Sequence, residues 1–133
     1  MAKEIKSNGT YRIRKRFDFE AAHSLPQVPE GHKCRNLHGH SYKVDVFVSS
    51  TELDEHGFVI DFGELKEFKK KFIDFPDGLD HRTLNNFFSN PTAEIIAKFL
   101  FDSITVLYED HKNIKIEKVR VWETDKAWGE YEA

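Results

Sequence analysis

The chain has 133 residues, of which 39% are apolar and 32% are charged, and its formal net charge is −3. This composition is typical of one soluble globular domain and excludes collagen-like, disordered, disulfide-stapled and membrane-spanning chains, since there is one cysteine and no apolar run of about 18 residues. We expect no nucleic-acid partner, because no basic field dominates, and a cytoplasmic location, because the start lacks a signal-peptide core and a lone cysteine suits a reducing compartment.

The beginning of the chain predicts two long strands. Residues 1–9 are expected to be a flexible lead-in, and residues 10–133 a single domain. Over residues 11–23 apolar and charged residues alternate, which predicts a half-buried strand with a charged outer face. A loop containing Pro and Gly follows over residues 24–37, and the alternation over 38–49 predicts a second strand.

Two helices are predicted in the middle of the chain. The first begins at Asp61, an N-cap residue that Glu64 follows three positions later, and its apolar stripe ends before Pro76. The second follows Asn90 and Pro91, a favourable pair for the N-cap and the first helical position.

The end of the chain returns to strands. Residues 114–123 predict a third strand with a bulge near Glu117, because the apolar residues before and after it fall in different phases, and residues 128–131 predict a short fourth strand. The order strand, strand, helix, helix, strand, strand predicts an α+β fold, with both helices on one face of a four-stranded antiparallel sheet. Such a sheet has two open edges, which pairing between subunits would protect.

Three histidines stand out at the neighbouring ends of the first two strands. His23 closes the first strand in phase with its apolar residues, and His38 and His40 share one face at the start of the second. If these strands are adjacent, the imidazoles converge, and three histidines with an open fourth position are typical of a catalytic zinc. Other late transition metals also bind imidazole, and an ordinary packed or hydrogen-bonded histidine is the alternative for each residue alone.

A cysteine and an Asp-His pair are candidates for proton transfer. Cys34 lies in the polar loop between Lys33 and Arg35, where positive charge and a nearby metal would favour the reactive thiolate. It is a candidate base or fourth ligand, and its place in a loop rather than on the strand face favours the base. Asp80 could orient the imidazole of His81 for proton transfer, although most such pairs are exposed loop residues.

Two further residues are candidates for substrate binding. Glu123 ends the third strand on its core side, where a carboxylate either pairs with Lys or Arg or accepts two parallel N–H bonds from a guanidine-like edge. Thr92 opens the second helix, where capping is the better default and ligand contact the alternative.

Together these residues lie in blocks that resemble the 6-pyruvoyltetrahydropterin synthase superfamily, and within it most closely the bacterial 6-carboxytetrahydropterin synthases of queuosine biosynthesis. The blocks extend over about residues 10–125 and include Phe19-Glu20-Ala21-Ala22-His23, Pro29-Glu30-Gly31-His32-Lys33-Cys34, Leu37-His38-Gly39-His40-Ser41-Tyr42, Leu79-Asp80-His81, Leu84-Asn85, Asn90-Pro91-Thr92-Ala93-Glu94 and Val121-Trp122-Glu123-Thr124. Pyruvoyl synthases of the animal type have more residues between the cysteine and His-Gly-His, so the short Arg35-Asn36-Leu37 spacing favours the carboxy branch.

The resemblance implies the tunnelling fold, assembled as a hexamer of two stacked trimers with active sites between subunits. The implied roles are Zn²⁺ ligation by His23, His38 and His40, catalysis by the base Cys34 and by the proton-transfer pair Asp80 and His81, and pterin binding by Glu123 with Thr92 nearby. The implied enzyme is a lyase that converts 7,8-dihydroneopterin triphosphate to 6-carboxy-5,6,7,8-tetrahydropterin, with release of acetaldehyde and triphosphate. Pyruvoyl synthase activity on the same substrate, or a non-catalytic zinc- and pterin-binding module, are the alternatives.

Overall fold

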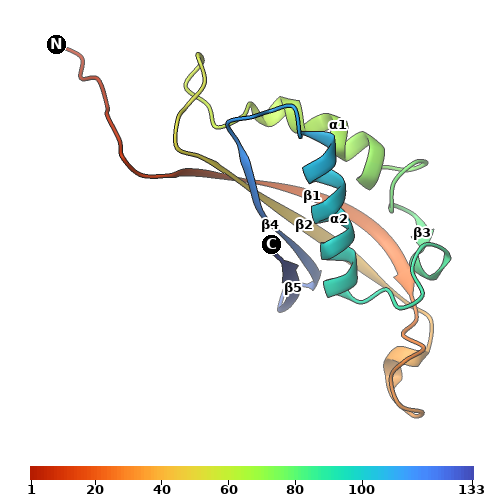
Figure 1. Ribbon diagram of the computed structural model, residues 1–133. Coiled ribbons are helices and arrows are strands. Elements are labelled where there is room, and N and C mark those ends of the chain that lie inside the picture. Colours follow the sequence, from red (N-terminus) through yellow and green to blue (C-terminus); the bar gives the residue numbers. More distant parts are fainter.

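The computed structural model describes residues 1–133 and forms a sheet with its helices on one face (Figure 1). The strands are β1 (Tyr11–His23), β2 (His38–Ser50), β3 (Arg82–Thr83), β4 (Lys115–Thr124) and β5 (Ala127–Tyr131). They lie in the order β3-β1-β2-β4-β5, and every neighbouring pair is antiparallel except β3 with β1. The predicted α+β class and all four predicted strands are therefore confirmed.

Helical structure occurs in two main segments, both on the same face of the sheet (Figure 1). The first passes from a 3₁₀ turn (Phe62–Leu65) through α1 (Lys66–Phe68) into a wider π-type turn (Lys69–Ile73), and the second is α2 (Ala93–Leu107). Isolated 3₁₀ turns lie at Lys33–Arg35 and Leu84–Asn86. None of these helices combines the length and apolarity that a membrane span requires.

The helix starts show which capping predictions hold. The carboxylate of Asp61 accepts a hydrogen bond from the N–H of Gly63 at 2.8 Å, which confirms the first helix start. The prediction that Asn90 caps α2 is wrong, because Thr92 is the N-cap and its Oγ1 accepts from the N–H of Ile95 at 3.2 Å. Pro91 belongs to the preceding turn, where its carbonyl is available to another partner.

The core lies between the sheet and the helices. Its fully buried members include, from β2, β4 and α2, Val44, Val46, Val48, Val119, Val121, Ile96, Leu100 and Ile104. At the site end of the sheet the ring of Phe19 stacks on Tyr42, with centroids 4.7 Å apart. Burying each large apolar side chain contributes about 1.5–3 kcal/mol. This packing gives the adjacent ends of β1 and β2 a rigid support.

One strand of the sheet was not predicted. Arg82 and Thr83 form β3 and pair in parallel with Ala21 and Ala22, so the sheet has five strands rather than four. Two residues are too few to show an alternating pattern, and their pairing depends on contacts that are distant in sequence.

The predicted bulge in the third long strand is confirmed. Phe47 of β2 pairs with Lys118, whereas Val48 pairs with Ile116, so Glu117 is the extra residue on β4. The bulge lets Ile116, which precedes it, and Val119, which follows it, both face the core, although the two residues differ in phase along the chain.

Candidate metal and active site

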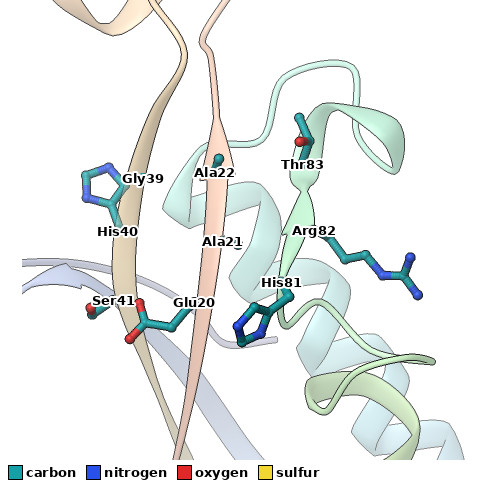
Figure 2. Close-up of a pocket in the computed structure, with 9 residues that line it drawn as sticks. All are labelled: Glu20, Ala21, Ala22, Gly39, His40, Ser41, His81, Arg82 and Thr83. Carbon is teal, nitrogen blue, oxygen red and sulfur yellow. The ribbon is translucent and has the colours of Figure 1, made fainter.

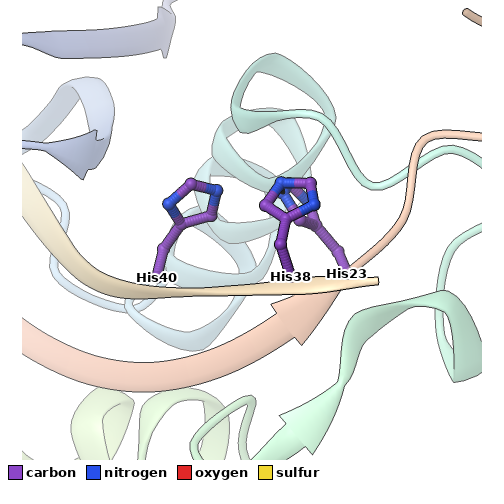
Figure 3. Close-up of side chains that lie close together, drawn as sticks. All are labelled: His23, His38 and His40. Atoms are coloured by element: carbon purple, nitrogen blue, oxygen red, sulfur yellow. Dashed lines mark hydrogen bonds between the residues drawn. The ribbon is translucent and has the colours of Figure 1, made fainter. Parts of the chain in front are cut away.

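Three histidine rings converge where β1 ends and β2 begins. His23 pairs with His38 and Ala21 pairs with His40, which places the three rings on the core side of the sheet (Figure 3). The Nε2 atoms of His23 and His38 are 3.0 Å apart, and one nitrogen from each of the three rings lies within 4.8 Å of the others. The structure thus brings together the residues that the sequence indicated as a metal site.

Two main-chain carbonyls fix the tautomers of two rings. Nδ1 of His23 lies 2.7 Å from the carbonyl oxygen of Pro91, and Nδ1 of His38 lies 2.7 Å from that of Asn36. Because a carbonyl can only accept, each Nδ1 carries the hydrogen and each Nε2 presents a lone pair. Carbonyl partners of this kind orient histidine ligands in metalloproteins.

The nitrogens that face one another have the properties of a ligand set. Nε2 of His40 is buried without a hydrogen-bond partner. Burial and the neighbouring imidazoles lower the pKa of His40, although Glu123 opposes them, so the neutral ring is favoured. Two facing lone pairs and a third orphaned nitrogen fit three neutral imidazoles around one metal ion, as zinc or another late transition metal requires.

Tyr42 contacts this cluster through His23, and the sequence did not indicate it as a site residue. It is 1% exposed, and its hydroxyl lies 3.2 Å from Nδ1 of His23. Burial raises the pKa of Tyr42, so the hydroxyl stays protonated. The signal was present, since Tyr42 continues the alternation of His38 and His40 along β2.

The carboxylate of Glu123 adjoins the histidines. Its Oε2 lies 3.4 Å from Nε2 of His23 and 3.5 Å from Nε2 of His40, and the side chain is 29% exposed. It forms no ion pair with Lys or Arg, which was the structural alternative. Glu123 is therefore placed to compensate positive charge at the cluster or to accept hydrogen bonds from a ligand bound there.

The main chain holds Cys34 in the 3₁₀ turn at the site end of the molecule. Its carbonyl accepts from the N–H of Leu25 at 2.8 Å, and its own N–H donates to Nδ1 of His32 at 3.1 Å. The neighbouring Arg35 donates to the carbonyls of Pro26 and Val28 and thereby braces the loop. The thiol is partly exposed and does not belong to the histidine cluster.

Asp80 and His81 interact directly at the edge of the sheet. The carboxylate of Asp80 contacts Nδ1 of His81 at 2.8 Å through one oxygen and accepts from the N–H of Glu20 at 2.8 Å through the other. Burial raises the pKa of Asp80, but these partners outweigh burial and the net pKa lies below the usual range. His81 has a φ of 59°, a backbone conformation that few residues other than glycine adopt, so the contacts at this corner hold it there.

His81 and His40 line the same cavity, although the Asp80–His81 pair does not belong to the histidine cluster. The cavity has a volume of about 510 Å³, and its lining also includes Glu20 and Ser41, which pair with each other in β1 and β2. Figure 2 shows His81 next to Glu20, with His40 on the far side of β1. The cavity is therefore reached by His81 from one side of β1 and by His40 from the other.

Comparisons with known proteins agree with this arrangement. A family model described as 6-pyruvoyl tetrahydropterin synthase matches residues 12–133. A 6-carboxy-5,6,7,8-tetrahydropterin synthase of Haemophilus influenzae is 35% identical, covering 92% of this chain and 99% of its own. Another from Synechocystis sp. is 44% identical, covering 67% of this chain and 70% of its own.

The fold agrees as well. The structure of Caenorhabditis elegans 6-pyruvoyl tetrahydropterin synthase superposes with a TM-score of 0.78 at 26% identity, covering 94% of this chain and 96% of its own. The architecture is thus the tunnelling fold, as the sequence blocks implied. Because the family model spans nearly the whole chain, the protein belongs to the 6-pyruvoyl tetrahydropterin synthase family and is an enzyme of that family.

Proposed function

We propose that the protein is a zinc-dependent lyase that converts 7,8-dihydroneopterin triphosphate and water to 6-carboxy-5,6,7,8-tetrahydropterin, acetaldehyde and triphosphate. The names of the Haemophilus influenzae and Synechocystis sp. relatives support this reaction. We place it in queuosine biosynthesis in the cytoplasm. The observation that carries the proposal is the set of three imidazoles with nitrogens within 4.8 Å of one another, two of which have their outward N–H groups bonded to main-chain carbonyls.

We assign zinc ligation to His23, His38 and His40. Zinc bound there would supply a Lewis acid that polarises substrate oxygens and acidifies the neighbouring bonds. The carbonyls of Pro91 and Asn36 keep two of the rings in the ligating tautomer. These two carbonyls therefore prepare the site before the substrate arrives.

The remaining residues bind the substrate and move protons. Cys34 acts as the base that removes a proton from the substrate, and His81, oriented by Asp80 at 2.8 Å, serves the opposite face. Glu123 accepts paired N–H bonds from the pterin edge, for which its 29% exposure leaves it accessible. Thr92 follows Pro91, whose carbonyl contacts the ring of His23, although the Oγ1 of Thr92 already caps α2.

We further propose that a neighbouring subunit completes each active site. Within one chain, the Asp80–His81 pair forms no hydrogen bond with the three histidines, and β1 lies between His81 and His40. A hexamer of two stacked trimers would bring the pair of one subunit to the metal of the next.

A turnover assay tests the proposed reaction. Zinc-loaded protein is incubated with dihydroneopterin triphosphate, with and without a chelator, and the products are identified by mass spectrometry. The expected result is a carboxypterin together with acetaldehyde, both lost when the metal is removed. A metal-bound oligomer that gives no turnover would leave a pterin-binding module as the better account.

The second candidate is pyruvoyl synthase activity on the same substrate. The family model and the Caenorhabditis elegans structure both carry that name. The same assay separates the two, because a pyruvoyl product retains the carbons that the carboxy reaction releases as acetaldehyde.

A further inference from the structure

The short strand β3 is part of a longer attachment between two chain segments. Its two residues pair with Ala21 and Ala22 of β1. On the preceding side, the N–H of His81 donates to the carbonyl of Glu20 at 2.6 Å, and the Asp80 carboxylate accepts from the N–H of Glu20. The segment that carries the Asp80–His81 pair is therefore bound along the last residues of β1, even though β3 itself is very short.

At the other end of this attachment, a side chain replaces the missing main-chain partners. Oδ1 of Asn85 accepts from the N–H of Ser24 at 2.8 Å, and its Nδ2 donates to the carbonyl of Ser24 at 2.9 Å. This two-point contact uses the donor and the acceptor of the carboxamide in the way a paired strand would. Asn85 thus binds the chain at Ser24, two residues beyond Ala22, the last residue that pairs with β3.

Ser24 lies between two residues that belong to different parts of the candidate site. It directly follows His23, whose ring belongs to the metal cluster, and it precedes Leu25, whose N–H donates to the carbonyl of Cys34 at 2.8 Å. The main chain from His23 to Leu25 therefore links the metal cluster to the turn of Cys34. Asn85 binds both the N–H and the carbonyl of Ser24, which is the middle residue of this link.

We propose that Asn85 is a positioning residue, which keeps His23, the Cys34 turn and the Asp80–His81 segment in register with one another. It touches none of the reacting groups and acts only through Ser24. Without the carboxamide, both polar groups of Ser24 lose their partners, and the chain after His23 gains freedom at the point where the ring must face the other two. The kinetic part of this inference depends on the proposed function, whereas the effect on metal binding does not.

The experiment compares Asn85→Ala and Asn85→Asp with Asn86→Ala, a matched control at the exposed neighbouring position. Zinc affinity is measured by competition with a chromophoric chelator, well below the melting temperature of each variant. Asn85→Ala is expected to weaken zinc binding about tenfold and to lower kcat more than it changes KM. Asn85→Asp keeps the acceptor but loses the donor, so we expect an intermediate loss, while the control remains at the wild-type value.

Amide hydrogen exchange separates positioning from general stability. In Asn85→Ala the amides of Ser24 and Leu25 should exchange faster, while the amides of α2 should not. A folded Asn85→Ala variant with unchanged zinc affinity and unchanged exchange at Ser24 would overturn the proposal. A lowered melting temperature with wild-type zinc affinity would reduce Asn85 to a structural role. If zinc affinity falls as expected but no pterin is converted, the positioning inference stands and the proposed function fails.

Discussion

The thiol of Cys34 makes no contact on which the turn depends, because the main chain of Cys34 forms the bonds to Leu25 and His32. Cys34→Ala should therefore leave the fold and the zinc content unchanged, while turnover falls about 10²–10⁴-fold through loss of the base. Elemental analysis and product formation in a single turnover measure the two quantities. Turnover at the wild-type level in this variant would remove Cys34 from the mechanism.

Asp80 allows charge to be removed while its hydrogen-bonding shape is kept. In Asp80→Asn the amide oxygen can still accept from Glu20, but no negative charge faces His81. Because the pKa of Asp80 lies below its usual range, the native side chain is ionised throughout the neutral range, and the variant should lose kcat about 10²-fold across that range. Zinc affinity should not change, since neither Asp80 nor His81 belongs to the metal cluster. A kinetic pH series with parallel zinc titration checks both expectations.

At the residue scale, the sequence indicated the side chains but not what orients them. Period-two spacing was enough to place His38 and His40 on one face, whereas their convergence with His23 also required the pairing of β1 with β2. The carbonyls of Pro91 and Asn36 could not be foreseen, because every residue has a carbonyl and only the folded chain shows which ones reach a ring. Asn85 belongs to the same class, since its partner is the main chain of a residue 61 positions away.

Among the elements, the open face of the sheet carries an ion pair between the partly exposed Arg16 and the buried Asp45, and this pair helps to join β1, β2 and β4. Arg16 contacts both oxygens of Asp45, at 2.7 and 2.9 Å, and the indole N–H of Trp122 donates to the same carboxylate at 2.9 Å. Burial raises the pKa of Asp45, but the hydrogen bonds from Arg16 and Trp122 lower it by a larger amount. The net pKa therefore lies below the usual value. The ionised carboxylate therefore stabilises the fold.

The pH dependence follows from the sign of that shift. Stability from Asp45 is fully present above the unfolded pKa of about 4 and is lost as the pH falls through the lower folded pKa. Asp45→Asn should lower the free energy of unfolding by about 1–3 kcal/mol at neutral pH, and the difference from wild type should shrink in acid. Urea unfolding of the wild type and the variant at pH 7 and pH 3 measures this difference in the free energy of unfolding. Asp18→Asn is the control, because Asp18 is 71% exposed and its pair with Lys43 is weak. An equal gap at both pH values would contradict the assignment.

At the element scale, prediction succeeded where a local pattern exists. The long strands and the bulge at Glu117 follow from the phase of apolar residues. The start of α2 was misplaced by two residues because Asn90, Pro91 and Thr92 are all acceptable near a helix start, and contacts with His23 decided among them. Strand β3 exists through pairing with β1, so nothing in its two residues announces it.

For the whole molecule, the sheet ends in two unprotected edges. Only residues 20–22 of β1 are bound by β3 and the residues before it, so residues 11–19 expose one edge, and β5 forms the other. We expect these edges to pair between copies, which gives a solution species several times the 15.6 kDa of one chain. Light scattering coupled to gel filtration measures the mass, and dilution should reduce turnover together with the oligomer. A fully active monomer would refute both the edge pairing and the shared active site.

The position of β2 in the sheet also determines when the molecule can be completed during synthesis. One side of β2 pairs with β1, which the ribosome makes first, but the other side pairs with β4, which begins only at Lys115. Pairing β4 with β2 closes a long loop between them, and the conformational entropy of the loop is lost before the strands gain any pairing energy. Folding is therefore slow for a chain of this size. Until β4 emerges, one edge of β2 has no partner. A nascent chain that stalls before Lys115 would therefore display an aggregation-prone strand, and chaperones would have to protect it.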